Sequence, residues 1–307
     1  MPTYQVTAEE HKNRLDRVLQ KVMNLTRAQV QKIIHGGDVT LNKKPVTPHL
    51  AVRTGDLLFY PALSAPKPQA KIIAPTLEII YEDGDVLVIN KPAGLLVHPV
   101  NENRHEPTVI DGLLALHPEI AKVGDDPRRP GLVQRLDKDV SGVMIIAKNA
   151  EAFSWLKKQF ADRLVKKEYL GLAYGQISKT HDTITLKIAR SKNKGRMVAR
   201  PQSQEGKEAV TEYDVLEKFK TATYVRVRIH TGRTHQIRTH FKAIDHPLVG
   251  DSLYKKNHMK NIHPIPMNRI FLHAHQLTVT LLSGQEKTFA APLPAELKKI
   301  LSLLSKV

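Results

Sequence analysis

The segment 135–147 constrains the fold of this chain more than any other. It places one acid, Asp137, in a short turn that ends in Ser141-Gly142, and it then continues as the apolar stretch Val143–Ala147. Five apolar residues in a row are typical of a short strand buried on both faces. A carboxylate just before such a strand is held in place by the core, as a catalytic group must be. We therefore expect a buried strand with a rigid acidic site at its start.

The charge of the chain indicates what kind of molecule it binds. Lys and Arg number 47 against 30 Asp and Glu, which gives a formal charge of +17. Six basic residues lie in 187–200 and five in 226–242, and neither stretch contains an acid. Such blocks suit contacts with phosphates, so an acidic catalytic residue in this chain points to chemistry on a polyanion. The alternatives are an anionic membrane, an acidic partner or a merely basic surface.

Several classes of protein are disfavoured. The chain has no cysteine, so disulfides, thiolate metal sites and thiol catalysis are excluded and a reducing, cytoplasmic compartment is expected. No apolar run reaches the length of a membrane span, and the N-terminal residues lack the apolar core of a signal peptide. Nucleotide-binding and hydrolase motifs are absent, and the histidines do not form a ligand pattern with carboxylates. We therefore expect neither a metal nor a cofactor.

Local patterns divide the chain into two domains. Residues 1–60 predict a small α+β module, in which Thr26 and Gln29 form the capping box of a second helix. Residues 61–75 contain four prolines and predict a stiff linker. Residues 76–307 predict a larger domain in which strands dominate and helices do not alternate with them. That pattern favours an α+β fold with a mixed or largely antiparallel sheet.

Caps and alternation predict the elements of the larger domain. A hairpin is expected across 77–89, with helices at 108–116, after the Asn149 cap, from a Thr234 cap to Ile244, and at 295–304. Further strands are expected at 169–177, 183–188, 210–216, 224–230 and 277–282.

Three further features carry candidate chemistry. The segment 231–240 is a strand-to-helix junction in which Arg233 and Arg238 suit a carboxylate or a phosphate. Lys91 and His98 lie in a Pro- and Gly-containing loop after a buried strand, where such residues are structural more often than functional. Tyr169 offers a ring on which a base could stack, although most tyrosines at strand starts belong to the core. The residues alone leave these alternatives open.

Together the motifs resemble those of the RluA/RluC/RluD family of pseudouridine synthases, and within it most of all the RluD type, which acts on large-subunit ribosomal RNA. Five segments correspond to family motifs in order: Lys91–Pro99, Arg135–Asp137 with Ser141-Gly142, Lys167–Tyr169, Thr231–Arg238 and Leu272–Ala274. Residues 9–60 resemble an S4 RNA-binding domain, and 76–304 resemble the synthase domain. The resemblance implies a pseudouridine synthase fold with a mixed, largely antiparallel central sheet.

The resemblance also implies a role for each matching residue. Asp137 corresponds to the catalytic aspartate, and Tyr169 corresponds to the ring that stacks on the target uracil and takes part in proton removal. Arg238 corresponds to the arginine that pairs with the aspartate, with Arg233 as the alternative. Arg135 corresponds to the arginine that helps to displace the target nucleotide from its stack. The other expected RNA-binding residues are Arg233, Lys91, His98, Arg27, Lys32 and Lys43.

Two positions depart from the family pattern. Gln134 stands where the family usually has His, and Val140 stands where it usually has Thr. The expected function is the isomerisation of specific uridines in RNA, above all in large-subunit ribosomal RNA, by a monomer without a cofactor. The alternative is a catalytically weak or inactive RNA-binding or ribosome-assembly factor on the same fold, and only Gln134 favours it. The sequence names neither the target uridine nor the choice between a covalent and a glycal mechanism.

Overall fold

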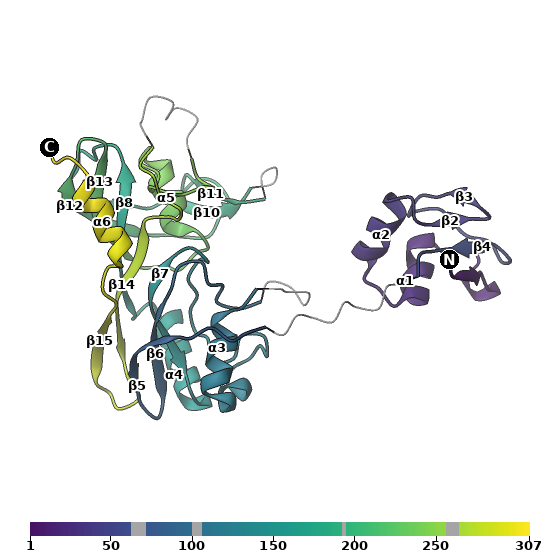
Figure 1. The fold of residues 1–307 in the computed structure, drawn as a ribbon, viewed down its shortest axis with the longest axis horizontal. Coiled ribbons are helices and arrows are strands. Elements are labelled where there is room, and N and C mark those ends of the chain that lie inside the picture. The colour runs from purple at the N-terminus through teal and green to yellow at the C-terminus, as the bar shows by residue number, and fades with distance from the viewer. Residues whose placement is uncertain (63–71, 100–105, 192–194, 256–263) are drawn as a thin grey trace. The chain divides into compact units, whose positions relative to one another are not determined.

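The computed structural model describes residues 1–62, 72–99, 106–191, 195–255 and 264–307. The chain forms two compact units, Met1–Ala70 and Lys71–Val307 (Figure 1), and each has its own apolar core. The predicted linker at 61–75 falls mainly on residues outside the described ranges. Within those ranges, no helix is long and apolar enough to cross a membrane.

The N-terminal unit packs two helices against a small sheet. Its elements are β1 (Thr3–Gln5), a short 3-10 helix (Ala8–Glu10), α1 (Leu15–Met23), α2 (Arg27–His35), β2 (Thr40–Leu41), β3 (Lys44–Pro45) and β4 (Leu57–Phe59), with sheet order β1-β4-β2-β3. The predicted capping box is confirmed, because the Thr26 side chain accepts from the backbone N–H of Gln29 and the Gln29 side chain bonds back. In α1, the fully buried Asp16 accepts hydrogen bonds from Arg14, Arg27 and Gln31, which fixes the two helices to each other.

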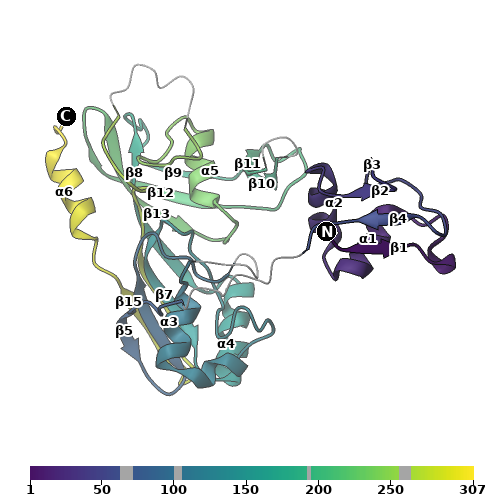
Figure 2. The same cartoon turned by 45° about the vertical axis from the view of Figure 1, so that its right-hand side comes forward.

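The larger unit is built on a nine-stranded sheet. Its elements are β5 (Glu78–Glu82), β6 (Val86–Lys91), α3 (Val109–Leu116), a 3-10 helix (Pro118–Lys122), β7 (Ser141–Ala147), α4 (Ala150–Ala161), β8 (Lys166–Tyr174), β9 (His181–Ile184), β10 (Lys187–Arg190), β11 (Met197–Arg200), β12 (Thr211–Lys218), β13 (Ala222–Ile229), α5 (Gln236–Ala243), β14 (Leu272–Thr280), β15 (Glu286–Ala290) and α6 (Ala295–Leu303). The sheet order is β5-β6-β7-β14-β8-β13-β12-β9, and β15 pairs with β14. Figure 2 shows α3, α4 and α5 on one side of this sheet and α6 on the other.

The prediction of a mixed, largely antiparallel sheet is confirmed. The pairing of β7 with β14 is parallel, and the other pairings described for the sheet are antiparallel. The hairpin formed by β5 and β6 and the caps at Thr108 and Asn149 also match the sequence prediction.

Two local predictions were wrong. The single strand expected at 183–188 is two strands, since β9 joins the large sheet while β10 pairs with β11 in a separate ribbon. The helix expected to begin at a Thr234 cap begins instead at Gln236, after His235 in a left-handed backbone conformation with φ of 55°. No side chain caps this helix, and the preceding turn is held by a hydrogen bond from the Thr231 hydroxyl to the side chain of Gln236.

Strand β7 places the acidic turn against the middle of the sheet. All seven of its residues are buried. Gly142 has φ of 123°, and a Cβ there would lie 2.1 Å from the carbonyl oxygen of Ala274 on β14. Only glycine permits this approach, which explains the Ser-Gly that follows the turn. The register pairs Gly142 with Ala274 and Ala274 with Tyr169, so Tyr169 lies level with the start of β7, and Asp137 is in the turn just before that strand.

Candidate active site

A cavity of about 380 Å³ opens beside the acidic turn. Its lining comes from the loop before β7, the start of β8, the end of β13, the turn 232–235 and α5. Asp137 is the one carboxylate among the lining residues, and the cations are Arg129, Arg135, Lys167, Arg233 and Arg238. Tyr169, Phe160 and several aliphatic side chains form apolar walls. The cavity therefore suits a flat, partly polar group attached to an anionic chain.

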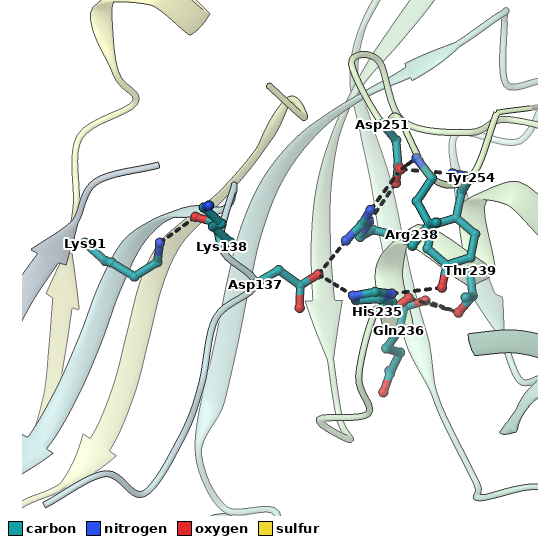
Figure 3. Close-up of polar contacts among 10 residues, drawn as sticks. Lys91, Asp137, Lys138, His235, Gln236, Arg238, Thr239, Asp251 and Tyr254 are labelled. Carbon is teal, nitrogen blue, oxygen red and sulfur yellow. Dashed lines mark hydrogen bonds and ion pairs between the residues drawn. The ribbon is translucent and has the colours of Figure 1, made fainter. Parts of the chain in front are cut away.

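Both partners of Asp137 contact the same carboxylate oxygen. Arg238 donates from Nη1 to Oδ2 at 3.0 Å, and Nε2 of His235 lies 3.8 Å from the same oxygen (Figure 3). Within the described residues, Oδ1 accepts no hydrogen bond. The arrangement leaves one oxygen of the carboxylate free to act on a substrate.

Arg238 is held by a second, more deeply buried acid. It donates from Nε and Nη2 to the two oxygens of Asp251 at 2.7 and 2.9 Å. The side chain of Asp251 is 1% exposed, and it also accepts from the backbone N–H groups of Leu253 and Tyr254. Burial alone would lower the pKa of Arg238, but the hydrogen bonds and charges of Asp251 and Asp137 raise it. The guanidinium is a rigid, permanent cation between two carboxylates.

His235 carries its Nε2 proton toward Asp137. Burial is the main cause that raises the pKa of Tyr254 to about 12, so this phenol keeps its proton at neutral pH. The hydroxyl proton is then free to go to Nδ1 of His235, 2.9 Å away. Burial, together with Arg238, lowers the pKa of His235 although Asp137 opposes this, so the ring is neutral at pH 7. A neutral ring that accepts at Nδ1 has its proton on Nε2, which puts an N–H dipole 3.8 Å from Oδ2 of Asp137, beyond hydrogen-bond distance, as a positioning contact.

Replacing His235 with Asn tests this role. Asn tolerates the left-handed conformation at this position, so the fold is retained. Loss of the Nε2 donor is expected to lower kcat about tenfold with little change in KM, because the ring acts on the carboxylate and not on RNA affinity. Steady-state kinetics of H235N beside Y254F, which removes the hydroxyl that fixes the tautomer, make the measurement. An unchanged kcat in both variants would exclude the positioning role.

The turn that carries these residues is locked by Gln236. Its side-chain oxygen accepts from the Thr231 hydroxyl at 2.7 Å and from the backbone N–H of Arg233 at 3.1 Å. Its nitrogen donates to the carbonyl of Val210 and to the Thr211 hydroxyl. The buried amide therefore ties the start of α5 to β12, which sets where Arg238 emerges.

Lys91 supports the acidic turn from the opposite side. It is fully buried, and its ammonium donates to three backbone carbonyls, those of Pro92, Leu95 and Lys138, at 2.8–3.0 Å. Lys138 is the residue after Asp137, so this contact fixes the acidic turn (Figure 3). Burial lowers the pKa of Lys91 to about 7, although Asp139 and Asp137 oppose the shift. The prediction that Lys91 contacts RNA does not fit the structure, because all three N–H donors of its ammonium bond to carbonyls inside the protein.

Tyr169 and Lys167 enter the cavity from β8. Tyr169 is 8% exposed, and burial and then the charge of Asp137 raise the pKa of its hydroxyl. The phenol is therefore protonated at neutral pH. Burial, with a contribution from Arg163, lowers the pKa of Lys167 to about 8. Lys167 belongs to the motif Lys167–Tyr169, but it was not predicted as a site residue.

The structure places the other predicted residues as follows. Arg135 and Arg233 line the cavity, and Arg238 rather than Arg233 pairs with Asp137. The Nε of Arg233 instead donates to the carbonyl of Glu208 at 3.0 Å. His98 lies in a neighbouring hollow. Arg27, Lys32 and Lys43 lie in the N-terminal unit, where Lys32 and Lys43 are exposed while Arg27 pairs with Asp16. Their RNA contacts stay predictions.

The two positions that depart from the family pattern both line the cavity. Gln134 has a buried amide nitrogen without a hydrogen-bond partner in the described part of the chain. Val140 is 3% exposed and packs in the core, where a hydroxyl would need a partner. Both changes leave the contacts of Asp137 with Arg238 and His235 intact.

Comparison with known families agrees with this geometry. Residues 85–243 match the RNA pseudouridylate synthase family, and residues 13–58 match the S4 domain. The chain belongs to the RNA pseudouridylate synthase family. It is therefore an RNA pseudouridine synthase, an isomerase with an S4 domain, and the predicted family, fold and activity are confirmed.

Relatives match over almost the whole chain. An uncharacterised RNA pseudouridine synthase of Synechocystis sp. is 38% identical over 297 residues, which cover 95% of this chain and 89% of the relative. The ribosomal large subunit pseudouridine synthase D of Blochmanniella floridana is 35% identical over 310 residues, or 95% of each chain. Among solved structures, human RNA pseudouridylate synthase domain containing 1 superposes with a TM-score of 0.60 at 27% identity, covering 76% of this chain and 92% of that one.

Proposed function

We propose that this synthase converts specific uridines of large-subunit ribosomal RNA to pseudouridine, with Asp137 as its catalytic residue. The observation that carries the catalytic assignment is that Asp137, whose Oδ1 accepts no hydrogen bond within the described residues, is the one carboxylate lining a cavity of about 380 Å³. Relatives named ribosomal large subunit pseudouridine synthase D, in Blochmanniella floridana and Zymomonas mobilis, support the choice of RNA at 35% and 33% identity.

The reaction is an isomerisation whose atoms balance without a cofactor. The bond from C1′ of the ribose to N1 of uracil breaks, the base turns, and C5 bonds to C1′. C5 then loses a proton and N1 gains one. Asp137 either attacks the sugar or base, or removes a proton from C2′, and in both cases it acts as an anion. Arg238 donates to its Oδ2 and so holds the carboxylate in place.

The neighbouring side chains divide the remaining work. The uridine leaves its stack at a cost of a few kcal/mol. Stacking on Tyr169 offsets about 1–3 kcal/mol of that cost. The hydroxyl of Tyr169 is protonated at neutral pH, so it is not a base when the uridine arrives. Its first role is therefore to stack on the uracil. Arg135, exposed at the rim, is placed to displace the target nucleotide.

The rest of the chain serves docking. The S4 domain and the net charge of +17 bring the RNA to the protein mainly through phosphate contacts, so affinity falls steeply with salt. A cytoplasmic monomer fits a target in the ribosome, and no cofactor is required by the chemistry.

A modification map of ribosomal RNA tests the proposal. Carbodiimide adducts that stop primer extension are compared between cells with the gene, cells without it, and cells that carry the D137N gene. One or more stops in large-subunit RNA are expected to vanish without the gene and to stay absent with D137N. An identical map in all three strains would contradict the proposal and favour an RNA-binding or ribosome-assembly factor, the role that the Gln134 departure suggests.

A further inference from the structure

A second cavity lies next to the uridine cavity, on the other side of Arg135. It has a volume of about 320 Å³ and is lined by Leu96, Val97, His98, Pro99, Asp126, Arg128, Arg129, Arg135, Leu136 and Lys138. Arg129, Arg135 and Leu136 also line the uridine cavity. The two cavities therefore share a wall, and a ligand in one lies close to a ligand in the other.

The polar groups of this cavity fall into two sets. Arg128 pairs with Asp126 at 3.1 Å, and Lys138 pairs with Glu106 at 2.7 Å, so their charges have partners. By contrast, Nδ1 of His98 and Nε of Arg129 are buried and have no hydrogen-bond partner in the described ranges of the chain. Buried polar atoms without partners are rare in folded proteins, and a bound ligand is one explanation for them.

The charge of the cavity selects the class of ligand. Four lining residues are cations and one is a carboxylate. His98, Arg129 and Arg135 all line this one cavity. Burial is the main cause that lowers the pKa of His98, and the charges of Arg129 and Arg135 lower it further. Arginine has no acceptor and forks onto phosphate oxygens. The set therefore suits an anion with several acceptor oxygens, such as a phosphate.

We propose that this second cavity binds a phosphodiester of the RNA strand adjacent to the target uridine, with Arg129 and His98 as its anchors. The proposal rests on the proposed function and adds to it. Arg129 and Arg135 lie between the two cavities, so a phosphate held there fixes the backbone while the neighbouring nucleotide turns into the site of Asp137. Since the contact is made to backbone, it positions the strand and is independent of sequence.

A set of RNAs with one neutral linkage each tests the proposal. The starting RNA is the shortest fragment of the mapped target that the wild-type enzyme isomerises, and a methylphosphonate replaces one phosphate at a time around the uridine. With wild-type protein, one neutral linkage next to the uridine is expected to raise Kd about tenfold, since a charge-assisted contact is lost. R129M is expected to raise Kd about tenfold for the unmodified RNA and to lose that linkage's effect.

Two further variants make the result specific. H98A is a second variant, which keeps the test valid if R129M does not fold. It is expected to reduce the effect of the same neutral linkage. K157M removes an exposed cation of α4 and is expected to keep the full effect. The proposal would be overturned if every neutral linkage raised the Kd of R129M and H98A as much as that of the wild type. It would also be overturned if the two variants lost the effect of removing a neighbouring base and kept the effect of the neutral linkage. If no fragment of the RNA is isomerised, the proposed function fails and this inference fails with it; isomerisation without coupling refutes the phosphate site alone.

Discussion

Replacing Asp137 with Asn is expected to reduce pseudouridine formation by on the order of 10⁴-fold or more, because the amide neither attacks carbon nor takes a proton. The shape of the side chain is retained, and Arg238 keeps its bidentate contact with Asp251. Folding and RNA affinity are therefore expected to stay close to those of the wild type. The rate is measured as release of tritium from C5 of labelled uridine, and the affinity is measured on the same RNA.

A neighbouring acid provides the matched control for this experiment. Asp139 lies two residues further along the same turn, is exposed, and does not line the uridine cavity. D139N changes the net charge by the same amount as D137N, and it is expected to retain the wild-type rate. Turnover by D137N at a rate near that of the wild type would refute the catalytic assignment, whatever the control does.

Features that depend on local sequence could be predicted. Val143–Ala147 form a buried strand because each side chain is apolar, and Thr26 with Gln29 caps α2 because both partners lie three residues apart. The break between β9 and β10 could not be seen, since the apolar pattern of 183–188 continues while the chain changes sheets. The alignment of Tyr169 with Gly142 through Ala274 was equally hidden, because it depends on the register of strands far apart in sequence.

The site was predicted where a motif carried it and missed where only the fold brings residues together. Asp137 and Arg238 lie in motifs, so their pairing could be proposed from the sequence. Asp251 lies in a loop without a pattern, 13 residues after Arg238, and nothing in its surroundings marks it as buried. Lys91 was expected to bind RNA because it lies in a segment that resembles a family motif, whereas the structure buries it, which is rare for lysine. Three carbonyls from two loops make its burial tolerable, and sequence spacing does not reveal them.

Replacing Arg238 with Met is expected to have the second largest effect, on both stability and rate. The change leaves the buried Asp251 without its ion-pair partner, which costs about 3–5 kcal/mol of unfolding free energy. It also removes the donor to Oδ2 of Asp137, so turnover is expected to fall about 10²–10³-fold. Denaturant unfolding measures the first effect, and tritium release under conditions where the variant is folded measures the second.

The double variant R238M/D251N separates these two consequences. Asn at 251 is neutral, and its side-chain oxygen can still accept from the backbone N–H groups of Leu253 and Tyr254. Most of the lost stability is therefore expected to return, since no unpaired charge stays buried. Turnover is expected to stay as low as in R238M, because Asp137 still lacks its cation. Recovery of the rate together with the stability would mean that Arg238 serves folding only, and that His235 alone orients the catalytic carboxylate.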